Sequence, residues 1–474
     1  MMTPLLTRRL YNQLLYEIES FKYQLRRLES YHYPTKVSLD LIGQLQTEID
    51  DLATNAERIR DEYTDDPETV ADLLANEHRR IAQTLLPLLG YIEHAQTRDV
   101  PWSFVQSIES LGAKIVPGRP VLTSVLNEHN YRILWYPNRK HLFLLLPRLH
   151  RLNVLWHTNV AHELFHAAID EFFDAHIRDV TVRIVGACTD VLKNYDEYQG
   201  APLFEKELGQ RRLDLLSKGC LIVWRRAMEE LLCDLGCACV FGPAAMMALL
   251  SMGLSYNLDA PPEAPSFYPP WRLRFRVVKK RVFDDSKKML AKLAGTPEIA
   301  QPVEAFRRSL DEFDRLASSK GDRKAIEGDP LSKIAYDDRK AIEGDPLLKI
   351  AYTEVDRCLD AGWEYVQSVA AKERPSWRVT HEEVLDLLRR LQQHIPPSEI
   401  QTGDNSKPRF KPANIASILF AGWVFESHWH ESEHSSSAED QVDYTTVMRL
   451  ILKGCEDAEL RRSYDAAHIG FENT

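Results

Sequence analysis

Two histidines and a glutamate in the stretch Ala161–His166 are the residues of this chain best suited to chemistry. His162, Glu163 and His166 have the spacing H-E-x-x-H. On a helix, residues four positions apart lie on the same face, so the two imidazoles can bind one Zn²⁺. Glu163 directly follows the first histidine and can reach a water on the metal. A zinc ion held by three protein ligands keeps a fourth position open for that water.

A continuous helix would position these side chains, and the surrounding sequence predicts one. Residues 153–170 contain no glycine or proline, and their apolar positions have the spacing of a buried helix. The helical pattern continues over residues 171–194. The alternative is coincidence, because so short a pattern occurs by chance in roughly 1–2 % of chains of this length. Coincidence would mean a helical scaffold that binds no metal.

A third ligand is available on a second predicted helix at residues 219–240. Glu230 and Asp234 are four residues apart, so they also share a helical face. Together, H-E-x-x-H and E-x-x-x-D resemble the motifs of the gluzincin metallopeptidases, the thermolysin-like and HtpX-like group. The resemblance covers about residues 100–290. It implies a zincin-like catalytic core in this part of the chain.

The resemblance also implies a role for individual residues. One zinc ion per chain would be bound by His162, His166 and Glu230. Glu163 would be the general base, and Asp234 would orient a ligand histidine through its other ring nitrogen. The implied reaction is hydrolysis of a peptide bond by a metal-activated water. If this holds, Glu230 should lie against both histidines in three dimensions.

Two more residues are candidates for stabilising the oxyanion of such a reaction. HtpX-like enzymes have a His-Pro segment followed by an arginine near this place, where this chain has Tyr268 and Arg274. A hydroxyl or guanidinium group near the metal can donate a hydrogen bond to an oxyanion. The alternative is that Tyr268 packs in a turn and Arg274 pairs with surface carboxylates. Gluzincins often have a small residue where this chain has Phe165, and we expect that ring to narrow the site.

Other histidines near the motif do not complete a metal site. Ile169 and Phe172 stand where metzincins have a glycine and a third histidine, so that family is excluded. On a continuous helix, His176 would lie about three turns beyond His166, too far to share its metal. His157 is not on the face that carries the ligands.

Two clusters of potential ligands have simpler interpretations. Three cysteines of the second helix are Cys233, Cys237 and Cys239. We interpret them as small apolar core residues, with a metal or redox role as the alternative. Three histidines near the C-terminus are His428, His430 and His434. We interpret them as part of a surface loop, with a metal site as the alternative.

Composition narrows the class of protein. The net charge of −11 argues against a general nucleic-acid-binding protein. Seven cysteines in 474 residues, an odd number, fit a reducing compartment better than a disulfide framework. The N-terminal sequence lacks the apolar segment of a signal peptide, and the longest apolar runs are too short to span a bilayer. We therefore expect a cytoplasmic protein that is not bound to a membrane.

The predicted fold class is mainly α with a small antiparallel β-sheet (α+β). Residues 1–98 have helical periodicity and predict an antiparallel helical bundle. Residues 99–295 form the predicted metallopeptidase core, and residues 296–474 form a C-terminal helical region. This last region contains a 16-residue tandem repeat at residues 322–353, which we interpret as a duplicated surface insertion.

The small sheet is predicted from three short runs dominated by Val, Leu, Ile and Tyr, at residues 121–125, 131–136 and 141–146. Pro137, Asn138 and Arg139 form a turn signal, so the last two runs are expected to make a hairpin. In zinc peptidases a sheet edge beside the metal helix pairs with extended substrate. We expect the 131–146 hairpin to supply that edge.

These observations favour a soluble zinc-dependent endopeptidase acting on a protein or peptide substrate. The alternative is a catalytically inactive zinc-binding protein with a regulatory or interaction role. In either case, the N-terminal or C-terminal helices are candidates for contact with a partner protein.

Overall fold

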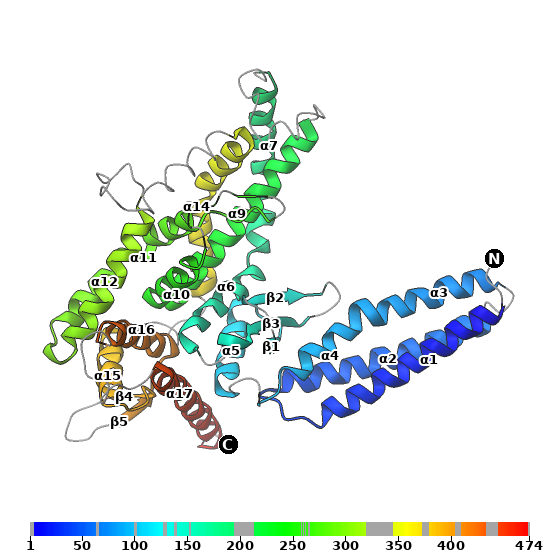
Figure 1. The fold of residues 1–474 in the computed structure, drawn as a ribbon, viewed down its shortest axis with the longest axis horizontal. Helices are drawn as coiled ribbons and strands as arrows, with labels where there is room; N and C mark the ends of the chain where they lie inside the picture. The colour runs from blue at the N-terminus through cyan, green and yellow to red at the C-terminus, as the bar shows by residue number, and fades with distance from the viewer. Residues whose placement is uncertain are drawn as a thin grey trace. The chain divides into compact units, whose positions relative to one another are not determined.

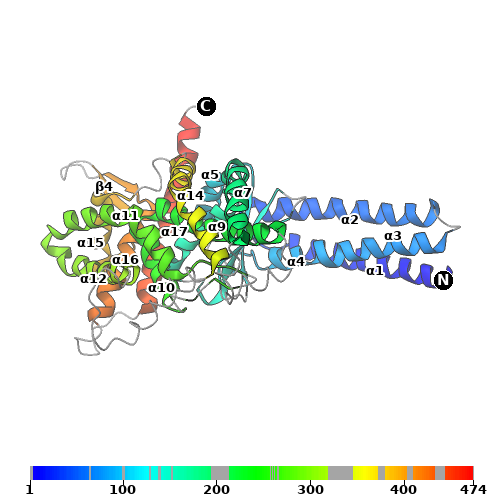
Figure 2. The same ribbon diagram turned by 90° about the horizontal axis from the view of Figure 1, so that it is seen from above.

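A computed structural model gives the fold of the chain (Figures 1 and 2). It describes all residues except 1–3, 63–65, 99–101, 127–129, 137–139, 151–152, 194–212, 257, 259, 261, 264–265, 319–344, 372–378, 403–408, 433–443 and 473–474. Contacts divide the chain into two compact units. The first comprises Met1–Ala113 and Gly118–Arg151, and the second comprises Lys114–Pro117 and Leu152–Thr474.

The first unit is built on helices whose apolar residues recur at helical spacing. They are α1 (Pro4–Glu29), α2 (Lys36–Glu62), α3 (Pro67–Arg80), α4 (Leu86–Glu93) and α5 (Trp102–Ile115), with a π-helical turn at Ile81–Leu85. α1 buries Leu14, Ile18 and Leu25, and it packs on both α2 and α3. Short connections make these three neighbouring helices run antiparallel. They are the helices that the periodicity of residues 1–98 predicts.

A three-stranded sheet completes the first unit. Its strands are β1 (Val121–Leu126), β2 (Arg132–Trp135) and β3 (Leu142–Pro147), followed by a 3₁₀ turn at Arg148–His150. The order is β1-β3-β2: β2 pairs antiparallel with β3, which confirms the hairpin, but β1 pairs parallel with β3. The sheet is therefore mixed, and the prediction of a purely antiparallel sheet was wrong. β3 is central because all its residues are apolar and buried, which suits a strand covered on both faces.

The sheet belongs with the N-terminal helices, although we had grouped it with residues 99–295. β2 is an edge strand among the described residues, because it pairs with β3 alone. An edge strand has unpaired backbone groups that can bind an extended peptide. That β2 binds substrate stays a prediction.

The second unit is almost entirely helical and surrounds one long helix, α9. Its helices are α6 (Asn159–His166), α7 (Asp170–Lys193), α9 (Leu213–Phe241), α10 (Pro243–Gly253), α11 (Trp271–Ala294), α12 (Ala300–Ala317), α14 (Pro346–Ala371), α15 (His381–Gln392), α16 (Ile415–Ser432) and α17 (Tyr444–Glu472). 3₁₀ turns occur at Val154–Thr158 and Pro297–Ile299. α9 packs against α6, α7, α10, α11 and α14, so it is buried over most of its length.

The helix that carries H-E-x-x-H is shorter than predicted. A 3₁₀ turn precedes α6, α6 ends at His166, and α7 begins at Asp170. The backbone carbonyl of Ala168 in the break accepts a hydrogen bond of 2.6 Å from the hydroxyl of Tyr365 on α14. This contact satisfies a carbonyl that a continuous helix would have used. The predicted continuous helix over residues 153–194 is therefore corrected to two helices.

The second copy of the tandem repeat is not a surface insertion. The first copy and residues 338–344 lie outside the described residues, but the second copy continues into α14. Asp345 accepts hydrogen bonds from the backbone N–H groups of Leu347 and Leu348, and all three residues are buried. Asp345 thus caps a helix that packs along α9.

Residues 399–412 contain a short hairpin that was not predicted. β4 (Glu399–Thr402) pairs antiparallel with β5 (Arg409–Pro412) within the region that we had predicted to be helical. Among the described helices of both units, none has the length and apolar character needed to cross a membrane.

Candidate metal centre

Two imidazoles on α6 face the middle of α9. His162 and His166 lie one helical turn apart, with ring centroids separated by 5.0 Å. The Nδ1 atom of His162 lies 2.9 Å from Asp234 Oδ1, and that of His166 lies 2.9 Å from Glu229 Oε1. If each Nδ1–H donates to its carboxylate, the lone pair of each Nε2 atom is available to a metal.

A third donor, Glu230, lies against both Nε2 atoms. Its buried carboxylate places Oε2 3.5 Å from His162 Nε2 and Oε1 3.8 Å from His166 Nε2. Tetrahedral zinc holds N and O ligands at about 2.1 Å, so the ligand atoms are about 3.4 Å from one another. Each observed separation, one from each carboxylate oxygen, is close to that value. The three residues predicted as ligands are therefore brought together.

The close approach of α6 to α9 depends on a glycine. Phe165 is completely buried, and a β-carbon at position 236 would lie closer than 3.0 Å to its ring. Gly236 on α9 therefore makes room for Phe165 on α6. The Phe165 ring, which we expected to narrow the site, is buried in the contact between α6 and α9.

Arg274 on α11 holds the carboxylate that orients His162. Its Nε donates to Asp234 Oδ2 over 2.6 Å, and an Nη atom donates to Oδ1 over 2.7 Å. The guanidinium is buried, stacks 4.2 Å from the ring centroid of Trp271 and lies 3.6 Å from Glu230. Two of its donors are thus used by Asp234 in a bidentate pair. Arg274 is therefore buried and paired with Asp234, which contradicts the surface ion pair that we had considered; its role as an oxyanion donor stays a prediction.

Arg226 and Glu229 support the second histidine, and the sequence analysis missed both. Arg226 donates to Glu229 Oε2 over 3.0 Å, and its other Nη atom lies 3.1 Å from Glu230 Oε1. Glu229 in turn holds His166 through Nδ1. A signal was present, because positions 226, 229 and 230 are neighbours on one helical face. Each imidazole therefore has its own carboxylate, and each of these carboxylates has its own arginine.

The acidic groups of the centre outnumber the basic groups. The carboxylates are Glu163, Glu229, Glu230 and Asp234, and the guanidiniums are Arg226 and Arg274. With neutral imidazoles, these six groups carry a net charge of −2, and one divalent cation would compensate it.

The pKa values of the metal-free centre reflect this imbalance. Burial disfavours the charged form of His162, but its hydrogen bonds to Asp234 and Glu230 outweigh burial and raise its pKa to about 10. For Glu230, burial acts to raise the pKa, yet the hydrogen bond to His162 and the charge of Arg274 hold the pKa well below its usual range. Without a metal, a proton on His162 therefore compensates part of the negative charge of the centre.

Glu163 and Tyr268 lie on the more accessible side of the centre. Glu163 is partly buried, and Tyr268 is 46 % exposed. The guanidinium carbon of Arg226 lies 4.4 Å from the centroid of the Tyr268 ring. Burial and the charge of Glu230 raise the pKa of Tyr268, so its hydroxyl is protonated at neutral pH. Tyr268 can therefore act as a hydrogen-bond donor at neutral pH.

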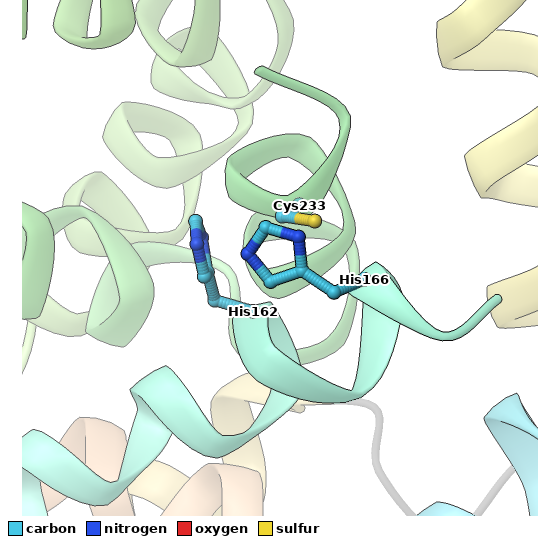
Figure 3. A group of neighbouring side chains, drawn as sticks. All are labelled: His162, His166 and Cys233. Atoms are coloured by element: carbon cyan, nitrogen blue, oxygen red, sulfur yellow. The ribbon is translucent and has the colours of Figure 1, made fainter. Parts of the chain in front are cut away.

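Cys233 on α9 is a second candidate for the third ligand. Potential ligand atoms of His162, His166 and Cys233 all lie within 4.8 Å of one another (Figure 3). Glu230, with oxygens 3.5 and 3.8 Å from the two Nε2 atoms, is the third ligand that the resemblance implies. Cys233 is buried, as expected of a core residue, but its thiol is next to the imidazoles. Burial and the charge of Glu230 raise its pKa well above the usual value.

The other cysteines and histidines considered from the sequence have different surroundings. The Cys237 thiol donates to the carbonyl oxygen of Thr158 over 3.2 Å, and burial raises the pKa of Cys239 to about 12. His176 Nδ1 lies 2.8 Å from the Phe172 carbonyl oxygen. His157 is buried in the 3₁₀ turn before α6. Of the C-terminal cluster, His428 lies in α16, whereas the side chain of His430 and all of His434 are outside the described residues.

Comparison of the chain with family models, curated proteins and solved structures found no match.

Proposed function

We propose that this chain is a zinc-dependent endopeptidase that hydrolyses peptide bonds of a protein substrate. The observation that carries the proposal is the approach of the Glu230 carboxylate, at 3.5 and 3.8 Å, to the Nε2 atoms of an H-E-x-x-H pair. Two imidazoles and one carboxylate are a donor set of catalytic zinc sites, which leave one position for water or substrate. A bound zinc ion would lower the pKa of water to about 7 and polarise the substrate carbonyl.

Four other residues have separate roles in the proposed reaction. Glu163 acts as general base: it takes a proton from the attacking water and delivers it to the leaving amine. Its position beside His162 in the sequence keeps it next to the metal. Tyr268 donates a hydrogen bond to the developing oxyanion. Asp234 and Glu229 keep the two imidazoles in the tautomer whose Nε2 lone pair faces the centre.

The proposal extends to the compartment and the substrate. All seven cysteines are free, as in proteins of reducing compartments, and this supports action in the cytoplasm. The substrate itself is proposed only by class, as an extended peptide or protein segment.

Replacement of Glu163 by glutamine tests the proposal, together with metal analysis. We expect about one zinc ion per chain in the wild type and in Glu163→Gln. Peptide cleavage should fall by about 10²- to 10⁴-fold in this variant, which is the usual contribution of a general base. His162→Ala and Glu230→Ala should lose both zinc and cleavage. The proposal would be contradicted by a folded wild type that takes up no zinc. It would also be contradicted by a Glu163→Gln protein that cleaves as fast as the wild type.

A catalytically inactive zinc-binding protein with a regulatory or interaction role is the second candidate. The observation that favours it is Cys233, because a centre with four protein donors is closed, as in structural zinc sites. The two candidates differ in one measurement. Zinc-loaded protein that cleaves none of a diverse peptide library, both as wild type and as Cys233→Ala with its fourth position open, would support the second candidate over the first.

A further inference from the structure

The Cys233 thiol is buried beside the candidate ligands without a hydrogen-bond partner of its own. Cys233 is completely buried, and its thiol makes no hydrogen bond to any residue that the structure describes. Several other buried thiols of the second unit have partners: Cys237 donates to the Thr158 carbonyl oxygen, and Cys220 Sγ lies 3.7 Å from Cys188 Sγ. What distinguishes Cys233 is that its thiol lies beside the two imidazoles.

The position of Cys233 on α9 directs it toward the metal position. It lies one helical turn after Glu229 and Glu230, and residues at this spacing share a helical face. That face packs against α6, which carries both imidazoles. The potential ligand atoms of Cys233, His162 and His166 all lie within 4.8 Å of one another. A cysteine side chain has three staggered positions, so its sulfur can move closer without a shift of the backbone.

We propose that Cys233 is a fourth ligand of the metal in the resting protein. This inference rests on the proposed function, because it concerns the same metal. Two imidazoles, one carboxylate and one thiolate complete a tetrahedron, and the thiol proton is released to solvent when the metal binds. A thiolate favours Zn²⁺ and Co²⁺ over Mg²⁺ and Ca²⁺. Substrate then reaches the metal only after the Cys233 sulfur has moved away.

Cobalt binding by the metal-free full-length protein tests this inference. A thiolate bound to Co²⁺ gives an intense charge-transfer band in the near ultraviolet, which nitrogen and oxygen ligands do not give. We expect this band in the wild type, growing in proportion to bound cobalt. It should be lost in Cys233→Ala and retained in Cys239→Ala, which alters another cysteine of the same helix. Cobalt bound by wild type without the band, or a band that persists in Cys233→Ala, overturns the inference.

The affinity for zinc provides a second readout. Loss of Cys233 should weaken zinc binding by at least the roughly 10- to 100-fold that loss of an outer-shell partner costs. Chelator competition measures this change, and unaltered affinity in Cys233→Ala counts against ligation. X-ray absorption of zinc-loaded wild type decides the question even if the variant does not fold. One sulfur at about 2.3 Å from zinc supports the inference, and a shell of nitrogen and oxygen alone overturns it.

These outcomes separate the inference from the proposed function. A wild type that binds neither cobalt nor zinc overturns both. Metal bound without a sulfur ligand overturns the role of Cys233 and leaves the three-ligand site intact.

Discussion

Replacing Arg274 with methionine tests how the buried charges of the metal centre are balanced. The guanidinium donates twice to Asp234 and lies 3.6 Å from Glu230, and all three side chains are buried. Methionine occupies a similar space but leaves both carboxylates without this charge. Removing one partner of a buried ion pair costs about 3–5 kcal/mol, because the remaining charge stays buried and uncompensated.

Thermal unfolding of the metal-free full-length chain measures this cost. At about 2 °C per kcal/mol for a unit of this size, the midpoint of the second unit should fall by roughly 6–10 °C. Arg281→Met is the matched control on the same helix. The carboxylate paired with Arg281 belongs to Asp360, which is 74 % exposed. A surface pair of this kind contributes about 0–1 kcal/mol, so the control should lose no more than about 2 °C.

A double variant separates charge balance from metal binding. Arg274→Met combined with Asp234→Leu removes both buried charges of the pair, so much of the lost stability should return. Zinc affinity should nevertheless stay about 10- to 100-fold lower, because His162 has lost the partner of its Nδ1 atom. The reasoning is refuted if Arg274→Met and Arg281→Met unfold at the same temperature, or if the double variant recovers nothing.

Three further predictions concern proton competition, helix packing and helix capping. In the metal-free protein, the raised pKa of His162 contributes stability that is fully present below about pH 6.5 and is lost as the pH rises through about 10. Metal must displace this proton, so zinc affinity should rise about tenfold per pH unit between these two pH values. Chelator competition measures the affinity, and an affinity that does not change with pH would contradict the prediction. Gly236→Ala should destabilise the second unit by about 1–3 kcal/mol in a urea titration, because the added β-carbon overlaps Phe165. Adding Phe165→Leu to the same chain should restore part of this loss. Asp345→Ala should cost about 0.5–2 kcal/mol in the same titration, because α14 loses its N-terminal cap; an unchanged midpoint would show that the cap does not stabilise the helix.

The proximity of His162, His166 and Glu230 could be predicted from the sequence, whereas the contacts that support these side chains could not. The i and i+4 spacing of His162 and His166 is a local property of a helix, so it could be recognised without the fold. The same applies to Glu230 and Asp234. The pairing of Arg274 with Asp234 depends on how three helices are rotated against one another, and no local pattern specifies that rotation.

The errors in the predicted fold have the same origin. The break between α6 and α7 is supported by the hydroxyl of Tyr365, which lies far along the chain, and no glycine or proline marks it. The parallel pairing of β1 with β3 is also non-local, whereas the β2–β3 hairpin joins neighbouring runs and was predicted. Long helices such as α9 and α11 were predicted because many residues contribute to one periodic signal.

The contact between Phe165 and Gly236 has a consequence for recognising relatives of this chain. Packing constrains the combined volume of the two side chains and not the size of either one. A relative with alanine or glycine before the second motif histidine should therefore carry a larger residue at the position of Gly236. The two positions should vary together among homologues, and a search that requires a small residue at the first of them would pass over chains in which the second provides the space.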